Sequence, residues 1–160
     1  MTWTSVTKLT IVTCSGQSAG EIELGHPIGV VVSIQAVDEH NKQITVDSEK
    51  LTERTKLIDY VTEKELHLGE ADEWCYWLDA DICERSGLSR SAGFRAVERD
   101  GAQAVEFGVT CHANPPKPTT KSIAIEITTD AGKVIRSSMN SHINSKVEIT
   151  VKGFEAVSEL

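Results

Sequence analysis

The chain has 160 residues, 39% of them hydrophobic and 25% charged, with a formal net charge of −8 at pH 7. This composition is typical of a folded domain that buries a core without metals or disulfides, and we expect one domain over residues 1–160. The acidic charge argues against binding to nucleic acid or to an anionic membrane, because phosphates would be repelled.

The N-terminal residues carry no secretory signal, because no basic segment is followed by an apolar one. No apolar stretch approaches the roughly 20 residues that a membrane helix needs. We therefore expect a soluble protein that stays in the cytoplasm or is exported without a cleavable signal.

The first part of the chain reads as β-structure. Residues 5–14 are rich in β-branched side chains, and residues 21–24 alternate between polar and apolar. In residues 28–37 the apolar positions recur at every second residue, which predicts a strand with a covered face. The turn sequence 38–42 follows, so residues 43–46 are expected to return as a hairpin partner.

Residues 47–68 change character. Asp47 or Ser48 could cap a helix, and Leu51, Leu57, Ile58 and Val61 form an incomplete apolar stripe. The stretch from Thr55 to Thr62 fits a strand equally well, so both alternatives stay open here.

Alternation returns in the second half of the chain. Val105, Phe107, Val109 and Cys111 predict a half-buried strand whose other face is polar. Further strands are expected at 123–127, 133–138 and 147–151. At least six short strands joined by turn sequences predict an all-β sandwich with a mixed helical or irregular insertion near residues 47–100.

Two segments resemble strands of the immunoglobulin fold: Leu9–Cys14 is similar to strand B, and Val109-Thr-Cys-His-Ala-Asn114 to strand F. The resemblance implies an immunoglobulin-like antiparallel sandwich with a Cys14–Cys111 bridge between the sheets. The sequence contains no CxxC pair. From the residues alone, apart from this resemblance, we expect the four cysteines to be buried free thiols.

The stretch 69–87 fits two periods. As a strand it places Trp74, Tyr76 and Leu78 on one face and Trp77, Asp79 and Asp81 on the other. As a helix it lines up Trp74, Trp77, Leu78 and Ile82 in an apolar stripe, with Arg85 and Gly87 at the end. The aromatic side chains favour the strand.

In the strand alternative, an aromatic ring beside carboxylates could hold a sugar by stacking and by hydrogen bonds to its hydroxyl groups. The candidate ligand-binding residues are therefore Trp74, Tyr76, Trp77, Asp79 and Asp81. The competing explanation is that the aromatic side chains belong to the core.

Other chemistries have weaker signals. Asp79, Asp81 and Glu84 could offer oxygens to Ca²⁺, but the spacing is not that of an EF-hand, and no metal ligands or catalytic residues are predicted. Residues 82–99 are similar to a helix-turn-helix, which implies DNA contacts through its Arg cluster. No common catalytic motif occurs in the sequence.

We therefore expect a non-enzymatic binding or assembly module without a cofactor. Its partner would be a protein or a glycan, bound through loops and the Trp/Asp-rich segment 70–84. A homo-oligomer is an alternative. A small metal-dependent or hydrolytic enzyme that uses the acidic segment is the second hypothesis, and nucleic-acid binding is the third.

Overall fold

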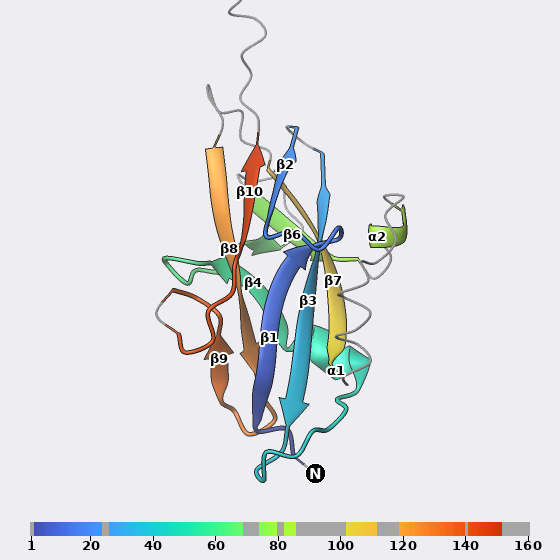
Figure 1. Ribbon diagram of the computed structural model, residues 1–160, viewed down its shortest axis with the longest axis vertical. Helices are drawn as coiled ribbons and strands as arrows, with labels where there is room; N and C mark the ends of the chain where they lie inside the picture. The colour runs from blue at the N-terminus through green and yellow to red at the C-terminus, as the bar shows by residue number, and fades with distance from the viewer. Residues whose placement is uncertain are drawn as a thin grey trace, which may run out of the picture.

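A computed structural model describes residues 2–23, 26–68, 74–79, 82–85, 102–111, 119–139 and 141–151. For residues 67, 68, 84 and 85 only the backbone is described. Within these ranges the chain forms two β-sheets that pack against each other, with a short helix, α1 (Ser48–Glu53), near the lower end in Figure 1.

Sheet 1 holds five strands in the order β1-β3-β7-β6-β5. Neighbouring strands are antiparallel except β5 and β6, which are parallel. The strands are β1 (Ser5–Thr13), β3 (Ile28–Val37), β7 (Gln103–Cys111), β6 (Trp74–Leu78) and β5 (His67–Leu68).

Sheet 2 has the order β2-β10-β8-β4, and β9 pairs with β8 at the far end of that strand. The pairing of β2 with β10 is parallel, and the others are antiparallel. The strands are β2 (Ala19–Ile22), β10 (Val147–Val151), β8 (Thr119–Thr128), β4 (Thr55–Asp59) and β9 (Val134–Arg136).

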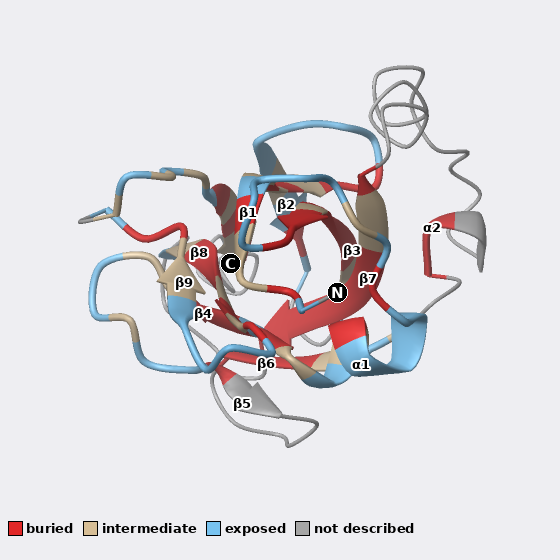
Figure 2. Cartoon of the chain, turned by 90° about the horizontal axis from the view of Figure 1, so that it is seen from below, coloured by how far each residue is buried: buried red, intermediate tan, exposed pale blue. Residues whose placement is uncertain are grey.

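The core lies between the two sheets and consists of the alternating apolar residues that the sequence predicted. Ile123, Ile125 and Ile127 of β8 are fully buried, and Val105, Phe107 and Val109 of β7 belong to the same cluster. Figure 2 colours buried residues red, and much of β3 and β7 carries this colour. Two packed and largely antiparallel sheets confirm the predicted immunoglobulin-like β-sandwich class.

The predicted return strand at 43–46 is wrong beyond its first residue. Gln43 forms an isolated bridge with Val37, but residues 44–46 are not a strand. The Ile44 N–H still bonds the Ala36 carbonyl, but the pairing cannot continue because β7 occupies this edge of β3 from Ile28 to Ile34. The Gln103 side chain instead bonds the backbone N–H and C=O of Val46.

Both alternatives for residues 47–68 are realised in part. Helix α1 ends at Glu53, and β4 begins at Thr55 and pairs with β8. The Asp47 side chain makes no capping hydrogen bond, whereas the Thr55 hydroxyl bonds the Leu51 carbonyl at 2.6 Å. The segment predicted as an insertion near 47–100 thus holds both described helices and also supplies β4, β5 and β6 to the two sheets.

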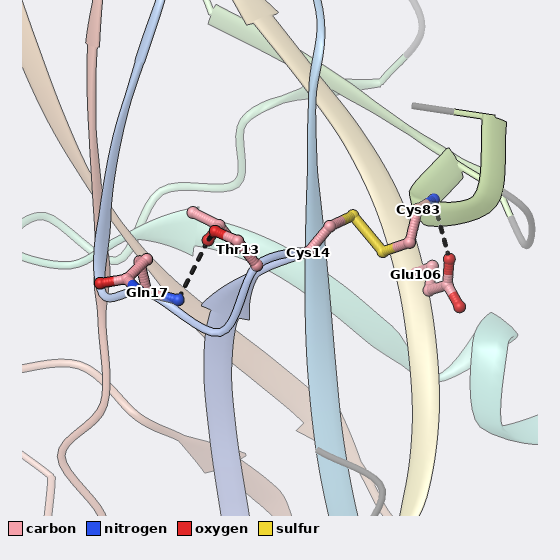
Figure 3. Close-up of a disulfide and its surroundings, with 6 residues drawn as sticks. Thr13, Cys14, Gln17, Cys83 and Glu106 are labelled. Atoms are coloured by element: carbon pink, nitrogen blue, oxygen red, sulfur yellow. Dashed lines mark hydrogen bonds between the residues drawn. A yellow bond between two sulfur atoms is a disulfide. The ribbon is translucent and has the colours of Figure 1, made fainter. Parts of the chain in front are cut away.

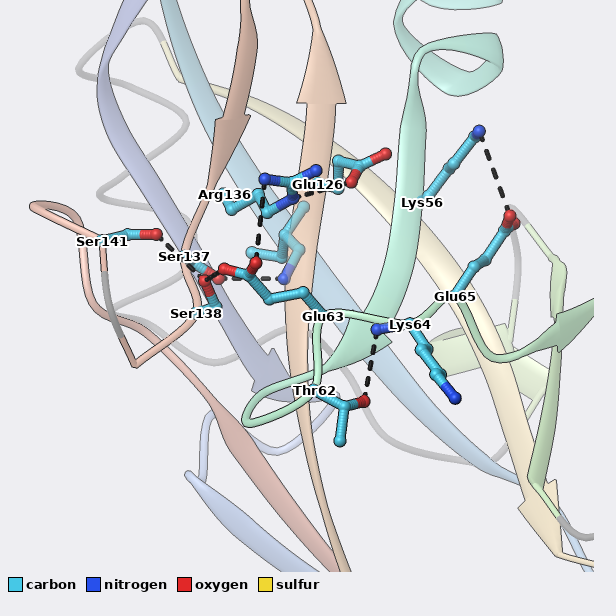
Figure 4. Close-up of polar contacts among 11 residues, drawn as sticks. Lys56, Thr62, Glu63, Lys64, Glu65, Glu126, Arg136, Ser137, Ser138 and Ser141 are labelled. Carbon is cyan, nitrogen blue, oxygen red and sulfur yellow. Dashed lines mark hydrogen bonds and ion pairs between the residues drawn. The ribbon is translucent and has the colours of Figure 1, made fainter.

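Hydrogen bonds and ion pairs connect the segments beside sheet 2, as Figure 4 shows. The Glu63 carboxylate accepts a hydrogen bond from the buried Ser138 hydroxyl and lies 3.8 Å from the Arg136 guanidinium. Arg136 also donates to Glu126 at 2.9 Å. These contacts join residues far apart in the sequence, and we assign them a structural role.

Candidate functional site

Strand β6 places the predicted site residues on two different surfaces. The side chains of Trp74 and Tyr76 point into the core, where they are 6% and 2% exposed. The Tyr76 ring packs edge-on against Phe107, with centroids 5.6 Å apart, and its hydroxyl donates to Glu65 at 2.6 Å. These two aromatic residues are therefore part of the sandwich interior and are left out of the site.

Trp77 and Asp79 lie on the outer face of sheet 1. The half-buried indole rests on Gly108 of β7, where an added Cβ would lie 2.5 Å from two of its ring carbons. Its N–H donates to the Asp79 carboxylate at 3.4 Å. Asp81, the fifth predicted residue, is outside the described residues.

The strand interpretation of this stretch is confirmed for residues 74–78 only. The alternation had extended the same strand to Ile82, but Ile82 begins the short helix α2 (Ile82–Arg85). The Asp79 N–H bonds the Glu106 carbonyl at 3.1 Å, and the Ile82 N–H bonds the Asp79 carbonyl at 3.3 Å. The chain therefore stays hydrogen-bonded to β7 through Asp79 and turns away from it between Asp79 and Ile82.

A shallow depression next to this turn was not predicted from the sequence. Leu78, the last residue of β6, is 51% exposed and lies at a depression of about 300 Å³. The depression is formed where β6 ends and β7 continues, with α1 as its other wall, and its lining residues are Ser48, Glu49, Thr52, Leu78, Ala104, Val105 and Glu106. No local pattern could have indicated it, because three distant segments contribute to it.

The outer face of β7 is covered, which corrects the predicted half-buried strand. Glu106 is only 4% exposed and Thr110 only 3%. The Glu106 carboxylate accepts a hydrogen bond from the Cys83 N–H at 3.3 Å, and Thr110 donates to the His26 carbonyl at 2.9 Å. Hydrogen bonds with two other segments offset the cost of burying these polar side chains.

The cysteines also differ from expectation. Cys14, just after β1, and Cys83 of α2 form a disulfide, while Cys75 and Cys111 are buried free thiols. The bridge passes over the outer face of sheet 1, as Figure 3 shows. The Cys14–Cys111 pair implied by the immunoglobulin resemblance is wrong, because Cys111 points into the core.

The described residues add no support for the metal-binding or the nucleic-acid-binding hypothesis. Among the described residues no group of three or more His, Cys, Asp or Glu side chains could hold a metal ion. The Asp81 and Glu84 carboxylates lie outside the described part of the chain, as do residues 86–99 of the predicted helix-turn-helix. No helix in the described ranges is long and apolar enough to cross a membrane.

Comparison with solved structures shows a weak likeness. No protein-family model matches the chain, and no curated protein matches it. The crystal structure of domains 4 and 5 of the S-layer protein SbsC is similar with a TM-score of 0.38 and 12% sequence identity, over 91% of this chain and 46% of that one. The chain thus spans less than half of that structure, and the likeness is too low to define a class of protein.

Proposed function

We propose that this protein is a non-enzymatic binding module whose recognition surface consists of Trp77, Leu78, Asp79 and the adjoining depression. The observation that carries the proposal is the exposed Leu78 side chain at the edge of a depression of about 300 Å³. An exposed apolar side chain at the edge of a depression offers the apolar contact that the core of a protein interface uses.

The chemistry of the depression favours a protein partner. Leu78, Ala104 and Val105 offer apolar contact, while Ser48 and Thr52 of α1 offer hydroxyl groups. Two acidic residues, Glu49 and the buried Glu106, belong to the lining and border the apolar part. A segment with an apolar side chain next to a lysine or arginine complements this surface, and the net charge of −8 steers basic partners toward the molecule.

A glycan is the second candidate, because of Trp77 and Asp79. The partly exposed indole lies flat on Gly108, and the neighbouring carboxylate could accept hydrogen bonds from hydroxyl groups. Such a ligand would depend on the Trp77 ring and less on Leu78.

Selection from a peptide library against the immobilised full chain tests the first proposal. We expect enriched peptides with an apolar residue next to a basic one, and loss of their binding in Leu78→Asp. Val134→Asp is the matched control, because Val134 is exposed to a similar extent, 47%, on β9.

A glycan array and light scattering separate the alternatives. Binding to an array that Trp77→Ala abolishes and Leu78→Asp leaves intact would favour the glycan. An oligomer that Leu78→Asp dissociates would make a second copy of the chain the partner. A monomer at all concentrations with no selected peptide and no glycan would contradict the proposed function.

A further inference from the structure

A second, small apolar cluster lies outside the sandwich, on the outer face of sheet 1. Its buried members are Cys14, Val31, Ile82 and Cys83, and Val12 and Ala104 pack against it. Two of the buried members come from α2, so this helix acts as a cover over β3 and β7. Without the cover, the buried Val31 would face water.

Non-covalent contacts and one covalent bond hold α2 on the sheet. The helix has four residues, and helices of that length are not stable by themselves. Ile82 supplies an apolar contact, and the Cys83 N–H donates to Glu106. The conformational entropy that the ordered segment loses opposes these contacts, and the covalent bond to Cys14 reduces that loss because it keeps the segment close to the sheet.

The sheet is shaped to receive this bond. Gly29 of β3 lies directly under it: an added Cβ would lie 2.4 Å from the Cys14 sulfur and 2.9 Å from an Ile82 methyl carbon. Both distances are far below any real contact, so the disulfide and the helix need a glycine at this position.

The disulfide can be approached from one side. A depression of about 210 Å³ reaches Cys14, and its lining residues are Thr13, Cys14, Ser15, Ala19, Gly20, Pro27, Ile28 and Gly29. Cys14 is 4% exposed, and Cys83, on the side of α2, is 1% exposed. Cys14 is the more exposed of the two bridged residues and lines the depression, so we take its sulfur as the point of attack.

We propose that the Cys14–Cys83 disulfide is a redox latch that a small dithiol opens, releasing α2 from sheet 1. One thiolate of the dithiol attacks the Cys14 sulfur, the bond between the two protein sulfurs breaks, and Cys83 leaves as a thiolate that takes up a proton. The second thiol of the reductant then attacks the mixed disulfide and frees Cys14. Two electrons and two protons pass to the protein, and the dithiol becomes a cyclic disulfide.

Release has two consequences for the surface. Val31, 2% exposed in the closed form, becomes exposed, and the Glu106 carboxylate, 4% exposed in the closed form, regains water. The proposed latch goes beyond the proposed binding role and does not depend on it.

Hydrogen exchange on the full chain, with and without dithiothreitol, tests the latch. Thiol titration in denaturant should count two free thiols before reduction, as Cys75 and Cys111 require, and four after it. We expect the amides of residues 82–85 to exchange about tenfold faster after reduction, while β8 and β10 keep their protection. Binding of the apolar dye ANS should rise in parallel.

Two pairs of variants control the experiment. Cys14→Ser/Cys83→Ser should reproduce the fast exchange without reductant, and Cys75→Ala/Cys111→Ala should respond to reductant like the parent chain. Unchanged exchange at 82–85 after complete reduction would overturn the latch. Loss of protection in β8 and β10 as well would also overturn it, because the bond would then hold the whole fold together.

Discussion

Gly29 and Gly108 lie directly opposite each other in the β3–β7 pair, and a bulky group from another residue covers each of them on the outer face of sheet 1. The disulfide sulfur of Cys14 lies over Gly29, and the Trp77 indole lies over Gly108. Two adjacent positions without side chains thus allow both groups to approach the backbone of the sheet. This glycine pair connects the proposed latch with the proposed recognition surface.

Substitution of Gly108 should be costly only while the indole is present. In Gly108→Ala the new methyl group would lie 2.5 Å from the Trp77 ring, and we expect a loss of about 1–3 kcal/mol in the free energy of unfolding. The combined Gly108→Ala/Trp77→Ala variant should cost less than the sum of the two single changes, measured by urea unfolding. Additive costs would show that the two residues are not in contact.

Substitution of Gly29 should change the redox state of the cysteines. A methyl group 2.4 Å from the Cys14 sulfur is incompatible with the bridge, so in Gly29→Ala the free-thiol count should rise from two toward four without reductant. The control is Gly132→Ala: an added Cβ there meets nothing within 4 Å, although its positive φ makes the change mildly unfavourable. A count of two in Gly29→Ala would contradict the proposed fit.

Asp59 should make stability depend on pH in the acid range. Burial raises the pKa of its carboxyl, but the hydrogen bond from Lys121 and those from the Thr62 and Val61 N–H groups outweigh burial and lower it below the ordinary value. The distance to the Lys121 ammonium is 2.6 Å. Because the folded pKa is lowered, this stabilisation is present above the unfolded pKa of about 4 and is lost as pH falls through the folded value.

Asp59→Asn should therefore cost roughly 1 kcal/mol at neutral pH, a figure that allows for solvent screening of the pair. Urea unfolding should show the difference from the parent chain to be constant at neutral pH and to shrink below about pH 4. Asp47→Asn serves as the control, because the Asp47 side chain makes no capping hydrogen bond. A difference that persists at low pH would contradict the assignment.

Tyr76 should resist ionisation while the protein is folded. Burial, then the hydrogen bond to Glu65 and the charge of that carboxylate, raise the pKa of the Tyr76 hydroxyl well above its ordinary value. Since the folded pKa is raised, the resulting stability is complete below the unfolded pKa of about 10 and is lost as pH rises toward the folded value.

The measurement uses phenolate absorbance in a Tyr60→Phe background, where Tyr76 is the only tyrosine left of two. Its ionisation should coincide with alkaline unfolding and not precede it. Tyr76→Phe should cost about 1 kcal/mol at neutral pH, because Glu65 is exposed and can return to water when it loses its partner. A tyrosine that titrates near pH 10 in the folded chain would contradict this placement.

Several features of the fold could be predicted because strand periodicity is a local property. The alternation in 105–111, 123–127 and 147–151 identified β7, β8 and β10 together with their core-facing residues. The stretch around Trp74 was ambiguous, because five residues of strand are followed, three residues later, by a helix. Neither period describes the whole stretch, so each fits in part.

The sequence by itself determined the class of fold, since apolar residues at every second position leave few ways to bury them other than between two sheets. It also identified Trp77 and Asp79 as neighbours on one face of a strand. Only the tertiary structure decided that Cys14 meets Cys83, at a sequence separation of 69, and that Glu106 is buried. Both outcomes depend on the register of β3, β7 and β6, which places Gly29, Gly108 and Trp77 in one row across the sheet. Register arises from contacts between distant strands, and no local pattern in the chain encodes it.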